Sequence, residues 1–486
     1  MERDWELVCD LNGGIRALLK RDSRYLPIEP AEDTQKDYLS RRRRAVLFNI
    51  FTRTLAGLVG MVFRTEPKLG ADVPEMIRGR EEAKGITALE GWAENIDLQG
   101  AHWTVFAKEL FTDAMRDGHT FIYVDMPPKL PPGATRADEQ AAGRRPYWIG
   151  YSAAQALNWR SSQEYRLINF QNGATTRIST GRQMLYQITF EECSTEPDGE
   201  YGEKDVKRYR VLRPGYWELW EEVDVDTKKE YVLVGEGESS LSKIPIAVVY
   251  GRKTGMLTSK PPLLDLAHIN IAHFQKYSDY SEGLRMCIPQ FCLKGVDATK
   301  DIAVIGHHTF HVVRPDGDVW FAEPTGAGLE PQRKDIQDLE AQMARLGLAI
   351  MSPNSQAQPQ KTATEVFANH IETDSDLATA ARSLKDGLEL ALTFTAQYSD
   401  PIATSGGSVE GLEIDQLTLN AQEMQAYSGM QAAGQFSLQT FWEVLGRAGR
   451  LPENFDPEVE EQRINDESAR KAEAMAVMFD RGGPPM

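Results

Sequence analysis

The chain has 486 residues and a formal net charge of -18, with 72 acidic against 54 basic side chains. This length predicts two to four folding units. Hydrophobic residues make up 41% of the chain, which is enough to build real cores and excludes wholesale disorder. Tight phosphate binding needs clustered Lys and Arg, so the acidity also excludes an ordinary nucleic-acid binder.

The cysteines and the N-terminal sequence bear on location. Cys9, Cys193, Cys287 and Cys292 form no CxxC pair and fit no common zinc spacing, so we expect buried or incidental thiols in a reducing compartment. The first residues are charged and lack the apolar segment of a secretory signal. The apolar stretch 45–63 carries Arg53 at its centre, which favours a buried amphipathic helix over a membrane span. We therefore expect a cytosolic protein, or one in a particle assembled there, with no membrane contact.

Residues 1–64 read as helical, with one helix over 5–20 and a longer one over 34–63, in which Leu39, Val46 and Ile50 share an apolar stripe. On such a helix, the four side chains of the run "RRRR" at 41–44 point in nearly all directions around the axis. Asp37 and Arg41 have the i,i+4 spacing of an ion pair. We interpret the run as a solvated or ion-paired face, and contact with DNA or an acidic partner stays open.

The middle of the chain predicts a helix over 101–117, a strand over 120–125 and a β-rich part over 146–250. Short runs rich in β-branched and aromatic residues, such as "MLYQITFEE" and "IPIAVVYG", are separated there by turn residues. Asp125 could be a catalytic acid in principle, but a carboxylate that caps the end of a strand is the favoured interpretation.

After Pro262 the pattern becomes a helix over 263–284, whose stripe includes Leu266, Tyr277 and Leu284. A compact insert over 290–330 follows. A second helix then carries an apolar seam with alternating spacing of three and four residues, which predicts packing against another helix. Its members are Ile336, Leu339, Met343, Leu346 and Ile350.

A polar connector, residues 351–361, precedes a capping box at 362–365. The helix that this box opens is expected to reach Tyr398, a length on the order of 50 Å. Shorter helices are expected over 418–448, and Asp456 followed by Pro457 predicts the start of a last helix that reaches Phe479.

No sequence motif for chemistry stands out: the chain lacks a P-loop, GxSxG, HExxH and GxGxxG. In "HHTFH" at 307–311, two imidazoles on one strand face do not close a metal site. We interpret these histidines as hydrogen-bonding surface residues, with metal binding as the lesser alternative. We expect no enzymatic activity, no cofactor and no metal.

The order of these elements resembles the portal proteins of tailed bacteriophages, and in particular a siphophage-like branch. The segments that carry the resemblance are "YLPIEPAEDTQKDYLSRRRRAVLFNIFTRTLAGLVGMVF", "GHTFIYVDMP", "ALNW", "IPIAVVYG", "PPLLDLAHINIAHFQKYSDY" and "LEAQMARLGLAIMSPNSQAQPQKTATE". They cover most of 5–64, 97–127 and 240–400. The likeness is weaker in 160–235 and in the C-terminal part, and it depends on the succession of motifs.

The resemblance implies an α+β, mainly helical portal fold with wing, stem, clip and crown, and with the β-rich part in the wing. The implied divisions are the wing at 1–261, the first stem helix at 262–289, the clip at 290–330, the second stem helix at 331–350, the tunnel loop at 351–361, the long spine helix of the wing at 362–398, and the helical crown and tail at 399–486.

The resemblance also implies a homo-oligomeric ring, typically of twelve copies, at one vertex of the capsid in the virion and assembled in the host cytoplasm. Such a ring is the conduit for double-stranded DNA in packaging and ejection. Its partners are the terminase large subunit, the head-tail adaptor, and the major capsid and scaffolding proteins. Because an acidic wall repels a polyanion, the net charge fits a channel that does not hold DNA tightly.

The tunnel loop would then be the part of the chain that touches moving DNA, through Asn354, Ser355, Gln356, Gln358, Gln360 and Lys361. Neutral amides offer exchangeable hydrogen bonds to a passing phosphate backbone. A plain solvent-exposed turn is the alternative. For the whole chain the alternatives are another virion assembly component, such as a capsid or adaptor protein, and a nucleic-acid-processing enzyme.

Overall fold

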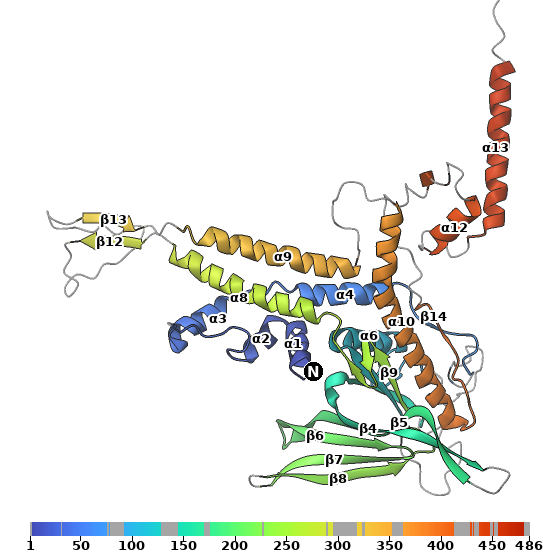
Figure 1. Cartoon of the computed structure of the whole chain (residues 1–486), viewed down its shortest axis with the longest axis horizontal. Helices are drawn as coiled ribbons and strands as arrows, with labels where there is room; N and C mark the ends of the chain where they lie inside the picture. The colour runs from blue at the N-terminus through green and yellow to red at the C-terminus, as the bar shows by residue number, and fades with distance from the viewer. Residues whose placement is uncertain are drawn as a thin grey trace, which may run out of the picture.

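The computed structural model describes residues 2–30, 32–74, 77, 92–127, 144–169, 175–225, 228–287, 290–294, 318–322, 326–351, 363–412, 428–429, 431, 437–447, 451 and 455–480. The molecule is elongated: long helices form one side and antiparallel sheets the other (Figure 1). This is an α+β architecture, as the sequence predicts. Within the described ranges, no helix has the length and apolar character needed to cross a membrane.

The N-terminal part is built of short helices rather than the two continuous ones that the sequence suggests. Gly14, with φ of 74°, separates the first two helices, and residues 45–49 leave helical geometry before the last. Val46 is consequently 55% exposed, not part of a buried stripe. The elements are α1 (Glu2–Asn12), α2 (Gly14–Lys20), the π-helical turn η1 (Thr34–Tyr38), α3 (Leu39–Arg44) and α4 (Ile50–Val62).

Asn49 explains why the long helix breaks. Its Oδ1 accepts a hydrogen bond from the backbone N–H of Thr52 at 3.0 Å, which caps α4. Its Nδ2 donates to the carbonyl oxygen of Leu11 at 2.8 Å and ties this start to α1. A new helix therefore begins at residue 50.

A three-stranded antiparallel sheet lies at the centre, in the order β3–β2–β9. The middle strand β2 (His119–Asp125) is buried along its whole length. Ile122 and Val124 belong to the core shared with the helices, whereas Phe121 and Tyr123 belong to a second core against the larger sheet. The strand therefore joins the helical and the β-rich halves. Its neighbours are β3 (Tyr147–Ser152), β9 (Ile246–Tyr250) and the preceding helix α6 (Trp103–Asp117).

The larger sheet is five-stranded and fully antiparallel, in chain order from β4 to β8. Ile188, Phe190 and Leu212 face the second core. The predicted β-rich part is confirmed, although β5 is one strand of 24 residues where the sequence suggests shorter runs. The strands are β4 (Ala156–Asn169), which follows the 3-10 turn η2 (Ala153–Gln155), β5 (Thr175–Asp198), β6 (Gly202–Arg213), β7 (Tyr216–Val225) and β8 (Lys228–Glu238).

The long helices follow the sheets in the chain. The predicted pair of helices around a small insert is present, and the second one begins seven residues before the seam residue Ile336. The long helix α10 crosses from the helical pair to the sheets and packs on β2 and β9 (Figure 1). The elements are α8 (Leu264–Met286), β12 (Gln290–Lys294), β13 (Asp318–Ala322), α9 (Leu329–Met351) and α10 (Ala363–Ser399).

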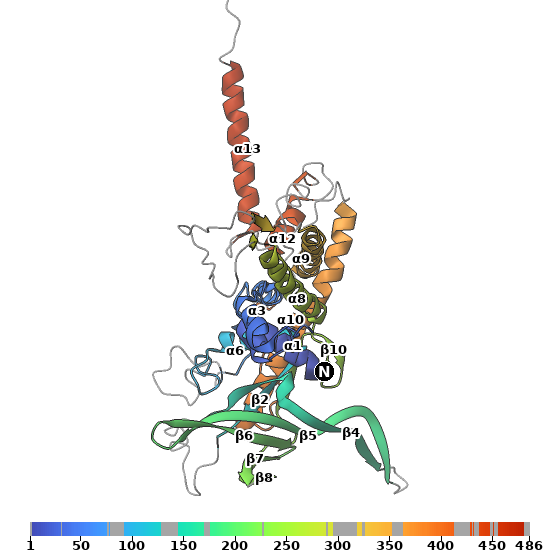
Figure 2. The same ribbon diagram turned by 90° about the vertical axis from the view of Figure 1, so that its left-hand side faces the viewer.

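The C-terminal part contains α12 (Leu438–Arg447) and α13 (Pro457–Asp480). Asp456 accepts a hydrogen bond from the backbone N–H of Glu458 at 2.9 Å, which confirms the predicted start of the last helix. Figures 1 and 2 both show α13 standing away from the body of the molecule. Small antiparallel pairs complete the fold: β1 (Lys68–Leu69) with β14 (Val409–Glu410), and β10 (Lys253–Gly255) with β11 (Thr258–Ser259).

Candidate functional site: the α8–α9 hairpin and its anchor

Helices α8 and α9 pack side by side and project from the body, with the β12–β13 pair at their far end (Figure 1). Each helix has 23 residues, so each is about 35 Å long. The chain passes from α8 through β12 and β13 into α9, and the helices are therefore antiparallel. This hairpin packs on the core at one end and projects from it at the other, so we treat it as the candidate functional site.

The predicted seam of α9 lies at the contact between the helices. Ile336 and Met343 are buried, and Leu339 and Leu346 are partly buried, with Leu346 against the main core. The backbone of Ile350 continues α9, but its side chain lies outside what the structure describes. The seam members that can be placed are therefore buried or partly buried.

The predicted stripe of α8 is only partly correct. Leu266 is buried and Tyr277 half-buried, but Leu284, near the far end, is 46% exposed. The close approach near that end is made by Gly283 instead, where a Cβ atom would lie 2.8 Å from Leu329 Cδ2. A glycine brings the two backbones together there, which leaves no need for a leucine contact.

Polar contacts fix the register of the two helices. Lys276 Nζ lies 2.6 Å from Asp335 Oδ2 on the surface. Deeper in the interface, His273 Nε2 lies 3.3 Å from Glu340 Oε1, and the imidazole stacks on Tyr277 with ring centroids 5.8 Å apart. Because a sliding of one helix by a turn would separate both pairs, they favour one register.

Asn270 fastens the first third of α8 to the start of α4. Its Oδ1 accepts from the backbone N–H of Phe51 at 3.1 Å, and its Nδ2 donates to the carbonyl oxygen of Phe48 at 2.8 Å. The first N–H groups of a helix have no partner within that helix, so this buried amide satisfies one of them. The sequence places Asn270 in the stripe but gives no sign of its partner more than 200 residues away.

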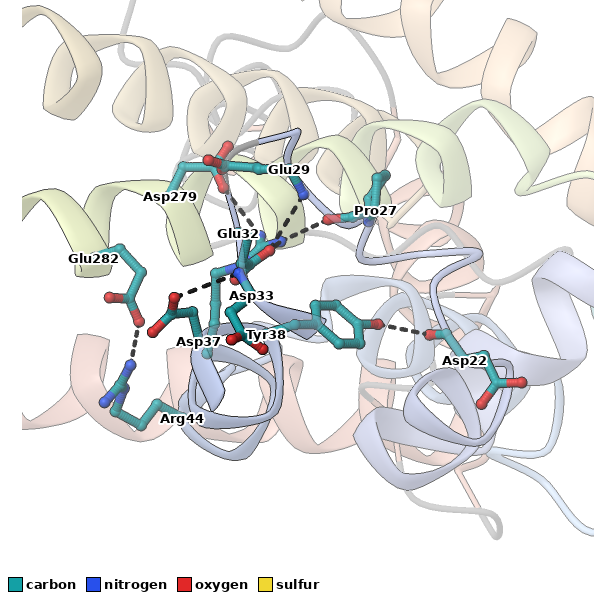
Figure 3. A network of polar contacts seen from close by, with 11 residues as sticks. Asp22, Pro27, Glu29, Glu32, Asp33, Asp37, Tyr38, Arg44, Asp279 and Glu282 are labelled. Carbon is teal, nitrogen blue, oxygen red and sulfur yellow. Dashed lines mark hydrogen bonds and ion pairs between the residues drawn. The ribbon is translucent and has the colours of Figure 1, made fainter. Parts of the chain in front are cut away.

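A buried arginine anchors the outer half of α8. Arg41 donates from Nε and Nη2 to the two carboxylate oxygens of Glu32 at 2.9 and 2.8 Å, and its Nη1 lies 3.4 Å from Asp279 Oδ1 on α8. Figure 3 shows Glu32 and Asp279 converging from the N-terminal segment and from α8, beside Arg44 and Glu282. The N-terminal segment is thus tied to the hairpin by charged side chains.

The pKa directions follow from this geometry. Burial works to lower the pKa of Arg41, but the bonds to Glu32 outweigh it and raise the pKa above its ordinary value. The hydrogen bonds from Arg41 lower the pKa of Glu32. Burial raises the pKa of Asp279 despite the opposing charge of Arg41. The Arg41–Glu32 pair is therefore the firmly ionised core of the anchor.

The interpretation of the "RRRR" run as ion-paired is confirmed for Arg41 and for Arg44, which pairs with Glu282. The specific Asp37–Arg41 pair is wrong. Asp37 instead accepts from the backbone N–H of Asp33 at 3.4 Å. The π-helical turn at 34–38 changes the spacing that an ordinary helix would impose, and Arg41 is only 4% exposed.

The predicted tunnel-loop residues lie outside the described residues: Asn354, Ser355, Gln356, Gln358, Gln360 and Lys361. The histidines of 307–311 and the capping residue Thr362 lie outside them as well. These predictions stay predictions. What the structure does place is each side of the connector, with α9 ending at Met351 and α10 beginning at Ala363.

Other candidate residues have structural roles. Asp125 ends β2, accepts from the backbone N–H of Met126 at 2.8 Å and from the Tyr147 hydroxyl at 2.9 Å, and lies 3.5 Å from Arg210 Nη1. The capping interpretation is confirmed. Cys193 is exposed, whereas Cys9 is part-buried, and burial together with Asp117 raises the pKa of its thiol to about 12. In the part of the chain that the structure describes, no cluster of three metal-ligating side chains is found.

One family of known proteins matches the part of the chain that contains the candidate site. Residues 262–399, which hold the hairpin and α10, match a family described as "Domain of unknown function (DUF4055)". No curated protein matches the chain.

Among solved structures, the chain is similar to one in "Virion of native gene transfer agent (GTA) particle", with 12% identity, 85% of this chain and 93% of that chain covered, and a TM-score of 0.36. It is also similar to one in "Neck of empty GTA particle computed with C6 symmetry", with 12% identity, 86% and 94% covered, and a TM-score of 0.35. At this distance the likeness assigns no function.

Proposed function

We propose that the chain is the subunit of a portal ring, a non-enzymatic conduit for double-stranded DNA at one vertex of a phage capsid. The observation that carries the proposal is the α8–α9 hairpin, with a β-strand pair at its far end and the long helix α10 directly after it. This succession is the one that the sequence resemblance implies for stem, clip and spine. In this proposal the hairpin axis runs along the channel.

The exposed face of α9 supports a channel wall. Its side chains are charged or amide-bearing with few exceptions, and four acidic groups are mixed with three basic ones along it. Such a surface offers weak, exchangeable contacts to phosphates without a dense cationic patch that would hold DNA. The exposed charged and amide-bearing members are Glu330, Gln332, Arg333, Lys334, Asp335, Gln337, Asp338, Glu340, Gln342 and Arg345.

The far end of the hairpin supports a docking role. Trp320 and Phe321 on β13 are 45% and 63% exposed. Exposed aromatic side chains are enriched where proteins bind one another. In the proposal this end receives the terminase large subunit during packaging and the head-tail adaptor afterwards. The sheets at the other side of the molecule would face the capsid and scaffolding proteins.

The connector between α9 and α10 completes the proposal. It would place the amides of residues 354–361 toward DNA in the channel, with Lys361 as one cation per subunit. A net charge of -18 per copy would keep a polyanion near the axis, because like charges repel. DNA would therefore pass without a long-lived complex.

The mass of the assembled particle tests the proposal. Purified protein should form particles of about twelve times 54.5 kDa, and negative-stain images should show rings with a central hole. Phage particles should contain one such ring each. Monomers at all concentrations, or open filaments in place of rings, would contradict the proposal.

A further inference from the structure

The larger sheet ends in a ribbon that lacks a third strand. β6 pairs with β5 only from Ile188 onward, whereas β4 pairs with β5 out to Asn169 and Thr175. From Arg160 and Gln187 to the tip, among the described strands, β4 and β5 pair only with each other. A two-stranded ribbon of this kind is marginally stable in water unless another surface supports it. We define the ribbon as residues 160–169 and 175–187.

The ribbon is basic in an acidic protein. It contains Arg160, Arg166, Arg177 and Arg182 against the single acid Glu164, a net charge of +3. The whole chain carries -18, so the ribbon is opposite in charge to the chain as a whole. Arg160, at the base of the ribbon, is exposed. The ribbon is therefore suited to an acidic partner surface.

The opposite end of the same sheet has the opposite charge. β7 carries four acids and no base, and β8 carries three acids and two lysines, a net charge of -5. Arg213, Arg208 and Lys229 already pair with Glu218, Glu221 and Glu222. Within the described chain, Glu230, Glu236 and Glu238 of β8 form no ion pair with a basic side chain.

The outer strand β8 also presents an apolar run at the sheet edge. Four consecutive residues have exposed fractions between 41% and 55%: Tyr231, Val232, Leu233 and Val234. Among the strands that the structure describes, β8 pairs with β7 alone, so the backbone groups of its outer edge face outward. A long, exposed, apolar edge strand is a surface that commonly pairs with another chain. Next to its acids, this edge combines the features that would bind a basic strand.

We propose that the basic ribbon of one copy docks along the acidic β8 edge of the next copy. In both views the ribbon and the β6–β8 end of the sheet extend in opposite directions (Figures 1 and 2). The two surfaces differ, so the contact is head-to-tail, and repeated contacts of this kind close into a ring when the rotation between copies allows it. This docking proposal depends on the proposed ring, because the ring supplies the second copy.

Charge reversal on each surface tests the contact. The ribbon variant carries Arg160→Glu and Arg177→Glu, and the edge variant carries Glu230→Lys and Glu238→Lys. Each places like charges opposite one another. Each variant should need a protein concentration about tenfold higher for half-assembly, measured by mass photometry and analytical ultracentrifugation. Raising the salt concentration should weaken wild-type assembly, because exposed ion pairs are screened.

A one-to-one mixture of the two variants gives the decisive result. The acidic ribbon of the first faces the basic edge of the second, and the basic ribbon of the second faces the acidic edge of the first. Alternating rings should therefore form at wild-type concentrations. Control variants with the same charge changes elsewhere are Arg16→Glu with Lys20→Glu in α2, and Glu461→Lys with Glu467→Lys in α13; all four residues are exposed. The controls should assemble normally.

A failure of the proposed contact can be distinguished from a failure of the proposed ring. If wild-type rings form and the reversed variants assemble equally well, or their mixture does not recover, the contact is wrong while the ring stands. If the wild type stays monomeric, both the contact and the ring are wrong. A variant whose circular dichroism departs from that of the wild type is replaced by its neutral form, Arg160→Gln with Arg177→Gln, which should weaken assembly by a smaller factor.

Discussion

The Asn270 side chain accepts a hydrogen bond from the backbone N–H of Phe51 at 3.1 Å, across 219 positions of the sequence. The same amide donates to Phe48, so one buried side chain joins α8 to the loop that starts α4. A leucine at this position would fill the space but leave both backbone groups without this partner.

We expect Asn270→Leu to lower the free energy of unfolding by about 1–3 kcal/mol, because buried polar groups without a partner cost that amount. Urea unfolding followed by circular dichroism measures the change. His268→Ala, at an exposed position of the same helix, should change it by less than about 0.5 kcal/mol. Equal effects of the two substitutions would contradict the role of the amide.

The Arg41–Glu32 pair should be costly to break on one side. Arg41→Leu leaves the Glu32 carboxylate, whose side chain is 10% exposed, without its partner. We expect a loss of about 3–5 kcal/mol, as for other buried pairs deprived of one member. Adding Glu32→Leu should recover a large part of that loss. Arg43→Ala, at an exposed neighbouring position, serves as the control, and a double variant less stable than the single one would refute the argument.

His119 predicts a pH dependence of stability. Burial lowers its pKa from 6.5 to about 4, and its Nδ1 lies 2.7 Å from Ser259 Oγ. Between these values the unfolded imidazole binds a proton and the folded one does not, so stability falls as the pH falls from 6.5 toward 4. The contribution is about 1.4 kcal/mol per pH unit.

His119→Asn should remove this contribution, so the difference in unfolding free energy between variant and wild type should shrink as the pH falls. Chemical unfolding at pH 7.5, 6.0 and 5.0 gives the measurement. A difference independent of pH would show that the pKa of His119 is the same in the folded and the unfolded state.

Glycines on facing helices offer a matched pair. A Cβ at Gly347 of α9 would lie 2.9 Å from Thr54 Oγ1 of α4, whereas a Cβ at Gly60 of α4 meets nothing within 4 Å. Gly347→Ala should therefore destabilise by about 1–3 kcal/mol through overpacking, and Gly60→Ala should be neutral or stabilise by up to about 1 kcal/mol. Thermal unfolding of both variants measures the two changes. Equal shifts in melting temperature would count against a close α4–α9 contact.

The polar connector allows a test of the proposed channel. Deletion of residues 354–361 should leave rings intact but impair packaging or retention of DNA. Replacement by a Gly–Ser segment of equal length separates loop length from side chains: rings should form, and the defect should remain. Normal packaging and retention in both variants would refute a DNA contact by this loop.

Periodicity predicted much of the helical part from the sequence. The stripes of α8 and α9 and the start of α13 at Pro457 are local patterns, and local patterns survive in the structure. Between Thr34 and Phe63 the same reasoning failed, because Asn49 caps a new helix with help from Leu11. A tertiary contact overrode the propensity of the segment.

The anchor of the candidate site could not be predicted for a related reason. A search for partners of Arg41 along one helix finds only Asp37, four positions before it. Its observed partners are Glu32, across an irregular turn, and Asp279, 238 positions away. Ion pairs of this kind depend on which segments the fold brings together. Pattern in the sequence alone does not contain that information.

The length of the hairpin has a mechanical consequence. It acts as a lever whose pivot lies near Asn270 and Gly347, where α8 and α9 meet α4. The far ends of the helices lie about 25 Å from this pivot, so a tilt of about 5° would move them by about 2 Å. The bonds of Arg41 and Arg44 to α8 lie between pivot and tip and act as a brace against that tilt. A force applied at β12–β13 would therefore be transmitted to the N-terminal segment before it reached the sheets.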